Sequence, residues 1–385
     1  MSLKVLQVIP RLNYGGAETG CYDLAHFLPE KGCKSYIITS GGKLLKFIKK
    51  DKVKVFRLPV HSKNPIIILL NTFLITLIVF FLNIDLVHAR SRAPAWSCFF
   101  SCKITRRKFV TTFHGRYNFK SELKKFYNSV MVRSDLIIAG SNFIFDHINK
   151  NYSKYLSDEK KLLVIFRGIN TDYFSNATIK NEKLEDFFSK NNLKTGEFKI
   201  LLPGRITPWK GQDLFIEALN ILRNQFKKEN FHAIILGSSE GKKVYVKKLS
   251  SLVDKYQMRS KITFIPQFKE MPIIYYISDV VVSASVEPEA FGRVSVEAQA
   301  MEKPIIASDH GGSRETILSN KTGFLFKNND INSLAEYLNK MIEMSKDELQ
   351  LIGNEGRKNV LKKFDVEKMC QSTYAEYQKL FKDKK

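Results

Sequence analysis

The feature that most constrains the fold is a series of short apolar strands that alternate with helical segments, stop once and then resume. Runs such as Val280–Val282 read as buried strands because they are short, β-branched and bounded by turn residues. The predicted strands are 4–10, 35–39, 53–58, 85–90, 109–114, 135–141 and 163–170, and then 199–203, 232–236, 262–265, 280–282 and 304–307. Strands that alternate with helices form parallel sheets covered on both faces. The sequence therefore predicts an α/β fold with two doubly wound sheets in series.

A polar stretch separates the two series. It runs from Thr171 to Lys199, is rich in Asn, Lys and Glu, and predicts a connection between domains. With 385 residues and 44% hydrophobic content, the chain is long enough for two domains that each bury a core. We therefore expect a first domain over residues 1–175 and a second over 195–365.

The formal net charge of +24 indicates affinity for polyanions, which leaves nucleic acid, anionic lipid and phosphorylated substrates open. The five cysteines form an odd set without a CxxC pair, so neither a disulfide framework nor a zinc site is indicated. Free thiols in a reducing cytoplasm are the simpler interpretation. The first strand also lacks the features of a signal peptide.

The segment 280–297 reads as a strand, a loop and a helix, and it holds two carboxylates. Glu289 lies in the loop and Glu297 one turn into the helix, so both can face the space above the carboxyl end of the strand, where open α/β sheets bind ligands. Gly292 lets the backbone approach a ligand before the helix begins at Val294. Carboxylates beside free helix N–H groups suit a ligand with hydroxyls and a phosphate. The alternative is that Glu289 caps the helix and Glu297 is solvated.

Two other loops combine glycine with charge at strand ends. Gly15 and Gly16 follow the first strand and allow close approach of a phosphate, which the dipole of the next helix favours. Gly204 opens the second series of loops, and Arg205 and Lys210 beside it can neutralise a diphosphate. Tight turns with surface cations are the alternative.

A histidine, His114, ends the strand that begins at Phe109, where α/β folds place functional loops. It can donate to a sugar hydroxyl or carry charge, and the alternative is a structural imidazole. A basic stretch with interleaved aromatic residues surrounds it, from Arg106 to Lys125. Such a stretch can bind single-stranded nucleic acid or anionic lipid headgroups, or form a solvated helix face.

The segment from Asn64 to Ile84 carries no charge and is long enough for a membrane span. A span would put Gly15 and His114 on opposite sides of a bilayer, where they could not share a site. We therefore expect a helix that is buried on the sheet or lies in a membrane interface, with a true span as the alternative.

Six motifs, in this order, resemble those of the retaining glycosyltransferases of family four, and the match covers nearly the whole chain. They are Gly15-Gly16-Ala17-Glu18, His114-Gly115, Gly168-Ile169-Asn170, Gly204-Arg205 with Lys210-Gly211, Glu289 with Glu297, and Gly311-Gly312. The resemblance implies the GT-B fold, in which a Rossmann-like acceptor-binding domain faces a Rossmann-like nucleotide-sugar-binding domain across a cleft. It also implies that the last segment, 366–385, is a helix that returns to the first domain.

The resemblance also assigns roles to residues. Arg205 and Lys210 would hold the diphosphate of a nucleotide sugar. Glu297 would bind the ribose hydroxyls and Glu289 the hydroxyls of the donor sugar, which His114 would reach from the first domain. The implied catalytic residues are His114, Arg205, Lys210 and Glu289, and the implied donor-binding residues are Gly15, Gly16, Gly204, Phe291, Gly292, Val294 and Glu297.

Enzymes of this family retain the anomeric configuration, and no protein nucleophile is clearly required. The sequence contains no Asp-x-Asp pair, which fits transfer without a metal ion or another cofactor. Two departures from the family pattern leave the nucleotide base open. Arg167 stands where an asparagine is frequent, and Pro266-Gln267 stands where a glycine commonly lies beside the base.

The apolar segment and the basic stretch favour a lipid-linked or cell-surface glycan acceptor of the lipopolysaccharide type, which would receive a hexosyl-type sugar. The protein would then be cytoplasmic and peripheral on the inner face of an anionic membrane, and nucleic acid would not be a partner. Two alternatives stay open. One is a nucleotide-sugar epimerase on the same fold, which consumes no acceptor, and the other is a basic nucleic-acid-binding protein whose affinity falls steeply with salt.

Overall fold

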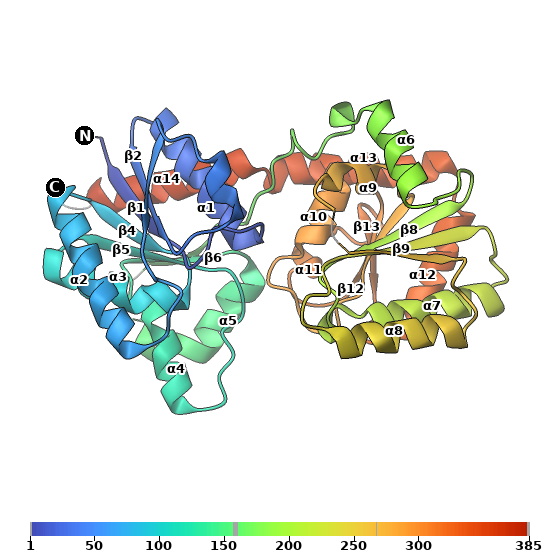
Figure 1. Ribbon diagram of the computed structural model, residues 1–385, viewed down its shortest axis with the longest axis horizontal. Coiled ribbons are helices and arrows are strands. Elements are labelled where there is room, and N and C mark those ends of the chain that lie inside the picture. Colours follow the sequence, from blue (N-terminus) through green and yellow to red (C-terminus); the bar gives the residue numbers. More distant parts are fainter. Residues whose placement is uncertain (1, 157–160, 267, 383–385) are drawn as a thin grey trace. The chain divides into compact units, whose positions relative to one another are not determined.

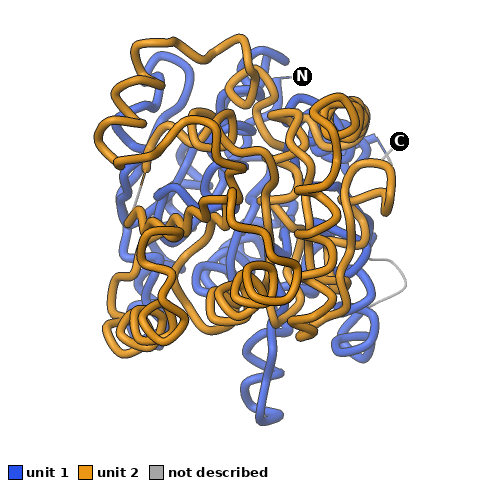
Figure 2. Tube along the Cα trace, turned by 90° about the vertical axis from the view of Figure 1, so that its right-hand side faces the viewer, with its two compact units in different colours: residues 1–168, 366–385 blue, residues 169–365 orange. Residues whose placement is uncertain are grey.

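The computed structural model describes residues 2–156, 161–266 and 268–382. The chain forms two compact units: unit 1 comprises Met1–Gly168 and Val366–Lys385, and unit 2 comprises Ile169–Asp365 (Figure 2). Each unit is a parallel sheet with helices on both of its faces (Figure 1). The prediction of two doubly wound α/β sheets is confirmed.

The sheet of unit 1 has, among the described residues, seven parallel strands in the order β3-β2-β1-β4-β5-β6-β7. The strands are β1 (Lys4–Val8), β2 (Lys34–Thr39), β3 (Val53–Arg57), β4 (Leu86–Ala89), β5 (Lys108–Phe113), β6 (Leu136–Ala139) and β7 (Lys161–Val164). The α-helices are α1 (Gly16–Glu30), α2 (Pro65–Phe81), α3 (Arg92–Thr105), α4 (Glu122–Asn128), α5 (Asn142–Tyr152) and α14 (Val366–Lys382).

The C-terminal helix α14 belongs to the core of unit 1, where it packs against α1. Its Tyr377 is fully buried, and the Tyr377 hydroxyl lies 2.5 Å from Nδ1 of His88 in β4. Burying an apolar side chain of this size contributes about 1.5–3 kcal/mol. The helix is therefore attached to the sheet by its own buried face, although residues 383–385 of the predicted segment lie outside the described residues.

The sheet of unit 2 has six parallel strands in the described part of the chain, in the order β10-β9-β8-β11-β12-β13. The strands are β8 (Phe198–Pro203), β9 (Phe231–Leu236), β10 (Ile262–Ile265), β11 (Val280–Ser283), β12 (Ile305–Ser308) and β13 (Gly323–Phe326). The α-helices are α6 (Asn181–Lys190), α7 (Gln212–Asn224), α8 (Lys243–Lys255), α9 (Met271–Tyr276), α10 (Arg293–Ala300), α11 (Ser313–Thr316), α12 (Ile331–Glu343) and α13 (Lys346–Lys363).

The polar segment from Thr171 to Lys199, which we predicted to connect the domains, lies within unit 2. It contains α6, whose buried Phe187 packs edge-on against Phe268 with 4.8 Å between the ring centroids. Phe187 is the buried side chain that packs this helix onto unit 2. One buried ring in an otherwise polar segment gives little signal in the sequence. The boundary between the units consequently falls at Gly168. We had predicted that the first domain ends at residue 175 and that the second begins at residue 195.

Helix α2 lies along α3 with one face packed and the other exposed. It begins where it does because the Asn64 side chain accepts a hydrogen bond from the N–H of Ile66 at 2.9 Å and Pro65 occupies the first turn. The buried face carries Asn71, Thr72, Ile75 and Val79. Within the described residues, no helix is both long enough and apolar enough to cross a membrane.

The order of the strands reverses once in each sheet. The reversal lies between β1 and β4 in unit 1 and between β8 and β11 in unit 2. The loops that leave the carboxyl ends of such strands diverge and open a crevice, which is where doubly wound sheets bind ligands. Each unit therefore offers one crevice, and the candidate residues lie in the loops around these two.

Candidate active site

The crevice of unit 2 is built from the loops that follow β8 and β11. Gly211 ends the first loop with φ of +70°, and a Cβ atom there would lie 2.0 Å from the carbonyl oxygen of Ala284. The N–H of Val286 also donates to the carbonyl of Trp209 at 2.9 Å. Glycine at 211 thus lets the first loop pack directly on the second, which places Lys210 beside Glu289.

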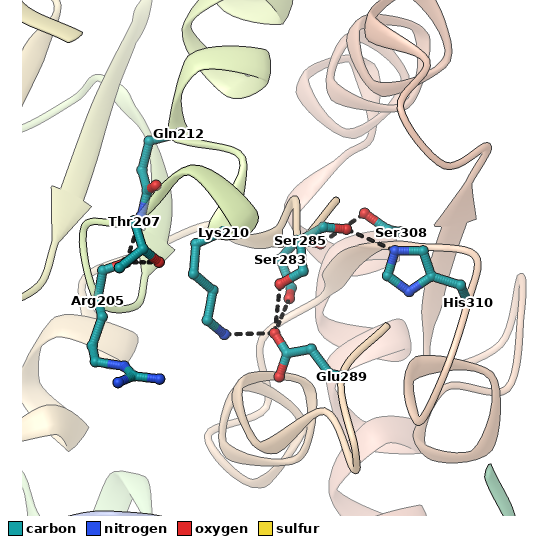
Figure 3. A network of polar contacts seen from close by, with 9 residues as sticks. All are labelled: Arg205, Thr207, Lys210, Gln212, Ser283, Ser285, Glu289, Ser308 and His310. Atoms are coloured by element: carbon teal, nitrogen blue, oxygen red, sulfur yellow. Dashed lines mark hydrogen bonds and ion pairs between the residues drawn. The ribbon is translucent and has the colours of Figure 1, made fainter. Parts of the chain in front are cut away.

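Lys210 and Glu289 form a buried ion pair at the centre of this crevice (Figure 3). Lys210 Nζ lies 2.6 Å from Glu289 Oε1, and the two side chains are 12% and 11% exposed. The same oxygen accepts from the Ser285 hydroxyl at 2.6 Å and lies 3.5 Å from that of Ser283. The helix cap that we considered for Glu289 is not present, because the N-cap residue of α10 is Gly292 and no side chain caps the helix.

The electrostatics of the pair keep Glu289 ionised. Burial acts to raise the pKa of Glu289, but the charge of Lys210 and the hydrogen bonds from Lys210 and Ser285 outweigh it, so the pKa lies below its usual value. A carboxylate with a low pKa is an acceptor for hydroxyl groups and does not supply a proton at neutral pH. Glu289 therefore has the chemistry of a binding and electrostatic group.

His310 completes the wall of the crevice behind Ser285. Its Nε2 lies 2.8 Å from the carbonyl oxygen of Ser285 and donates to it, and its ring is 9% exposed. Nδ1 is shielded from solvent and has no hydrogen-bond partner among the residues the structure describes.

Arg205 supplies a second cation on the same loop as Lys210. Its side chain is exposed, and its guanidinium lies 6.0 Å from the centre of the Trp209 ring. Lys210 Nζ lies 4.5 Å from the same ring. The carbonyl of Arg205 accepts from the Gln212 side chain at 3.0 Å, which fixes the backbone of the loop that begins at Gly204. The indole therefore holds both cations near each other without neutralising either.

The second carboxylate, Glu297, is held by two partners. Oε2 accepts from the buried Tyr275 hydroxyl at 2.8 Å, and Oε1 lies 2.5 Å from Nε of Arg293. Burial and then the charge of Glu297 raise the pKa of Tyr275 well above its usual value, so this phenol stays a donor. The Glu297 side chain is 9% exposed, and the alternative of a solvated carboxylate is wrong. The helix that holds it starts at Arg293, one residue before the predicted Val294.

A pair of glycines braces the loop between the two carboxylates. The N–H of Gly312 donates to the carbonyl of Glu289 at 2.9 Å. A Cβ atom at Gly312 would lie 2.4 Å from the backbone of Phe291, and one at Gly311 would lie 2.6 Å from the Glu289 carbonyl oxygen. The loop that carries Phe291 and Gly292 therefore packs closely against the loop of Gly311 and Gly312. Only glycine at these two positions leaves room for this contact.

An apolar cavity of about 110 Å³ lies beside the carboxyl ends of β8, β9 and β10. Its walls include Ile206, Val246, Leu249, Phe264 and Pro266. The sequence pointed only to Pro266 at this place, and its neighbour Gln267 lies outside the described residues. The cavity has the size and apolar lining that suit one flat ring system.

The remaining predicted residues lie in unit 1. Gly15 and Gly16 begin α1 at the carboxyl end of β1, and His114 directly follows β5. Both ring nitrogens of His114 are shielded from solvent and lack a hydrogen-bond partner within the described part of the chain. Burial lowers the pKa of His114 well below its usual value, and the charges of Arg90 and Arg167 lower it further. His114 is therefore a neutral imidazole in this structure.

Two family models match the chain and together span most of it. The model "Glycosyl transferases group 1" matches residues 184–359, and "Glycosyltransferase Family 4" matches residues 14–173. A solved glycosyltransferase from Rickettsia africae is 37% identical with a TM-score of 0.90, and the match covers 99% of both chains. The chain belongs to the family-four glycosyltransferases. Its two Rossmann-like units are those of the GT-B fold.

Two further proteins are more distantly similar to this family-four member. The capsular polysaccharide biosynthesis glycosyltransferase CapM of Staphylococcus aureus is 28% identical over 244 residues, which is 61% of this chain and 60% of that protein. Anabaena HepE, solved in complex with UDP and glucose, has a TM-score of 0.81 at 21% identity, with coverage of 98% of this chain and all of the other. The second likeness is one of fold.

Sequence reasoning found most of the loop residues but missed those that support them. The residues missed in unit 2 are Trp209, Gln212, Tyr275, Ser283, Ser285 and His310. A signal existed for two, because Ser283 and Ser285 lie two residues apart at the end of a strand and so share a face. None of the described residues forms a cluster of three or more His, Cys, Asp or Glu side chains that could hold a metal ion.

Proposed function

We propose that this protein transfers a hexosyl-type sugar from a nucleotide-diphosphate sugar to an acceptor, with retention of the anomeric configuration. The observation that carries the proposal is the buried Lys210–Glu289 pair beside the exposed Arg205 at the strand reversal of unit 2. The pair offers a carboxylate for sugar hydroxyls, and the two cations offer positive charge for a diphosphate. Family membership and the nucleotide-bound state of the HepE structure support this use of the crevice.

The donor fits the crevice in three parts. Its base would enter the apolar cavity beside Phe264, and its ribose hydroxyls would donate to Glu297, whose oxygens already face Tyr275 and Arg293. The diphosphate would lie against Arg205 and Lys210, and the N–H groups of Phe291 and Gly292 would support the sugar. Of the donor-binding residues that we predicted in unit 2, this assignment uses Phe291, Gly292 and Glu297.

The reaction follows from where charge develops. The bond from the anomeric carbon to the diphosphate oxygen breaks, the sugar becomes cationic and the leaving group gains negative charge, which Arg205 and Lys210 stabilise. The acceptor hydroxyl then bonds to the same face of the anomeric carbon, and its proton goes to an oxygen of the leaving phosphate. Glu289 stays ionised throughout and orients the sugar. We propose that this transfer needs neither a metal ion nor another cofactor.

Donor use is tested by the release of nucleoside diphosphate from a panel of nucleotide sugars, with and without a membrane lipid extract as acceptor. We expect one donor to release its nucleotide, faster with the extract, and Glu289→Gln to abolish the release. Conversion of the donor to an isomer without such release would instead establish the epimerase. Steeply salt-dependent DNA binding with no donor turnover would establish the nucleic-acid-binding alternative.

We further propose a lipid-linked or cell-surface glycan of the lipopolysaccharide type as acceptor, with the protein peripheral on the cytoplasmic face of an anionic membrane. The support is an apolar face on α2 whose side chains recur at helical spacing and are 49–77% exposed. They are Ile66, Leu69, Leu70, Phe73, Phe80 and Phe81. Beside them lies a groove of about 380 Å³ lined by residues that include Lys63, Trp96 and Phe126. An apolar face next to lysines suits the surface of an anionic bilayer.

Sedimentation with vesicles tests the membrane proposal. The full-length protein should bind vesicles that contain phosphatidylglycerol better than phosphatidylcholine alone, and Ile66→Glu with Phe73→Glu should weaken that binding at least about tenfold. Val244→Glu is the matched control, because Val244 is 87% exposed on a helix of unit 2. Equal binding by both variants would contradict the proposal.

A further inference from the structure

Unit 1 has a small cavity at its own strand reversal, and two arginine residues line part of it. The residues around it include Gly16, Gly20, Arg90, Thr112, His114 and Arg167. Its volume is about 20 Å³, which is room for one or two oxygen-sized atoms. None of the described residues that line it is an aspartate or a glutamate. The described lining therefore contributes two guanidinium groups and no carboxylate.

Arg90 is the most buried of these cations. It follows β4 directly and is 5% exposed. Its Nη1 donates to the neutral Gln7 side chain at 3.3 Å, while its Nε is buried and has no partner in the described residues. A guanidinium keeps its charge at physiological pH, and a buried charge without a counter-ion is costly. The structure thus leaves a buried donor unused at the edge of an empty space.

Other groups around the cavity are also donors. His114 has two ring nitrogens without partners among the residues described, and burial together with the neighbouring guanidinium groups keeps it neutral, so it can donate one hydrogen bond. Helix α1 begins at Gly16 without a side-chain cap, so its first N–H groups face the same end of the sheet. Arg167 lies over Gly16, where a Cβ atom would come within 2.3 Å of its Nη2.

Glycine keeps this space open at two positions. A Cβ atom at Gly16 would collide with Arg167, and one at Gly20 would lie 3.1 Å from Nη2 of Arg90. Both glycines lie on α1, and Gly16, His114 and Arg167 are only half-buried, which leaves a route from solvent. Arg167 is also the residue that departs from the family pattern, so this arrangement belongs to the present chain.

We propose that this cavity binds the anionic oxygens of a phosphate or carboxylate group on the acceptor, with Arg90 as the principal ligand and Arg167 as a further donor. The inference rests on the proposed function, in which unit 1 takes the acceptor and Arg205 and Lys210 of unit 2 take the donor diphosphate. The acceptor is accordingly an acidic molecule, such as a phosphorylated lipid or an acidic saccharide.

The test is calorimetric titration of the full-length protein with inorganic phosphate, and separately with D-glucuronate, at low ionic strength. Both titrations use an Arg205→Ala background, because that change weakens anion binding in unit 2 at an exposed residue. We expect at least one anion to bind and Arg90→Gln in the same background to weaken it about ten- to hundredfold, as loss of a charged hydrogen-bond donor predicts. Unchanged affinity in Arg90→Gln would overturn the proposal.

Two further measurements test whether the variants are misfolded and whether the cavity binds the donor instead of the acceptor. Thermal unfolding should show that phosphate stabilises the Arg205→Ala protein, that Arg90→Lys keeps part of this effect and that Arg90→Gln loses it. In the otherwise wild-type chain, Arg90→Gln should leave the affinity for the nucleotide sugar within about twofold. An equal loss of donor binding would assign the cavity to the donor diphosphate and overturn the proposal. Absence of any donor binding, with phosphate binding still dependent on Arg90, would refute the proposed transferase and not the anion site.

Discussion

The two crevices use the same scaffold and arrange their charges in opposite ways. In unit 2 the buried cation Lys210 is neutralised by Glu289, and Arg205, which has no ion-pair partner within the described part of the chain, is exposed. In unit 1 the cation Arg90, which has no carboxylate partner among the described residues, is itself buried. A paired cation holds a carboxylate ready for hydroxyl groups, whereas a buried cation without a carboxylate is suited to an anion that arrives from outside. Under our proposal, each unit therefore binds a different substrate, unit 2 the donor and unit 1 the acceptor.

The largest effect should come from breaking the pair in unit 2. Lys210→Ala removes charge from the leaving group and leaves Glu289 buried and unpaired, so kcat/KM for nucleotide release should fall about 10²–10³-fold and stability by about 3–5 kcal/mol. Lys190→Ala, which breaks an exposed pair with Asp186, is the control and should change neither. Adding Glu289→Gln to Lys210→Ala should recover stability without activity. Recovery of both would show that Lys210 is only structural.

The second effect concerns the loop contact that creates the pair. Gly211→Ala should lower the free energy of unfolding by about 2–4 kcal/mol, because alanine at φ of +70° is strained and its Cβ would collide with Ala284. Gly241→Ala is matched, since Gly241 has φ of +71° and nothing within 4 Å of its Cβ position. It should lose only about 1–2 kcal/mol. Equal losses in urea titrations would mean that the loops do not need this contact.

The third effect is a shift in pH dependence. The pKa of Glu289 in the folded protein lies below its usual value, so the contribution of the ion pair is complete above the ordinary carboxyl pKa and is lost as the pH falls through the lower, folded-state pKa. Ser285→Ala removes one donor and should move the acid limb of kcat/KM upward by about one pH unit. Ser283→Ala is the control, because its 3.5 Å contact is at the limit for a hydrogen bond. If the acid limb of kcat/KM does not move in Ser285→Ala, the ionisation of Glu289 is not its cause.

The smallest effect is expected in unit 1, and it contrasts with the first. Arg90→Gln removes a buried charge that has no carboxylate partner in the walls of its cavity, and it loses one hydrogen bond to Gln7. These changes oppose each other, so the free energy of unfolding in the absence of ligand should change by less than about 1 kcal/mol. Chemical denaturation measures it. A loss as large as that of Lys210→Ala would show that Arg90 is a structural residue.

Much of the fold could be predicted because its signals are local. The β-branched run at Val280 and the glycines at 15–16 and 311–312 mark strands and loops by their own chemistry, and each predicted strand overlaps an observed one. The polar helix that carries Phe187 was assigned to a connection, because one buried ring changes composition very little. Local composition is therefore a poor guide to where a unit ends.

The candidate site was predicted only in part because its support comes from distant residues. Tyr275 reaches Glu297 from 22 residues away, and His310 reaches the carbonyl of Ser285 from 25 residues away. No periodicity links such positions before the strands are assembled. The same is true of Arg90, which contacts Gln7 across 83 residues and whose burial without a carboxylate partner is visible only in three dimensions.

The central claim is that the crevice of unit 2 binds a nucleotide-diphosphate sugar, and calorimetry with a panel of nucleotide sugars tests it without knowledge of the acceptor. We predict that one donor binds the full-length protein, that Arg205→Ala weakens this binding at least about tenfold through loss of a charged hydrogen-bond donor, and that Lys190→Ala leaves it unchanged. Binding of no donor, or equal binding by the wild type and Arg205→Ala, would contradict the account.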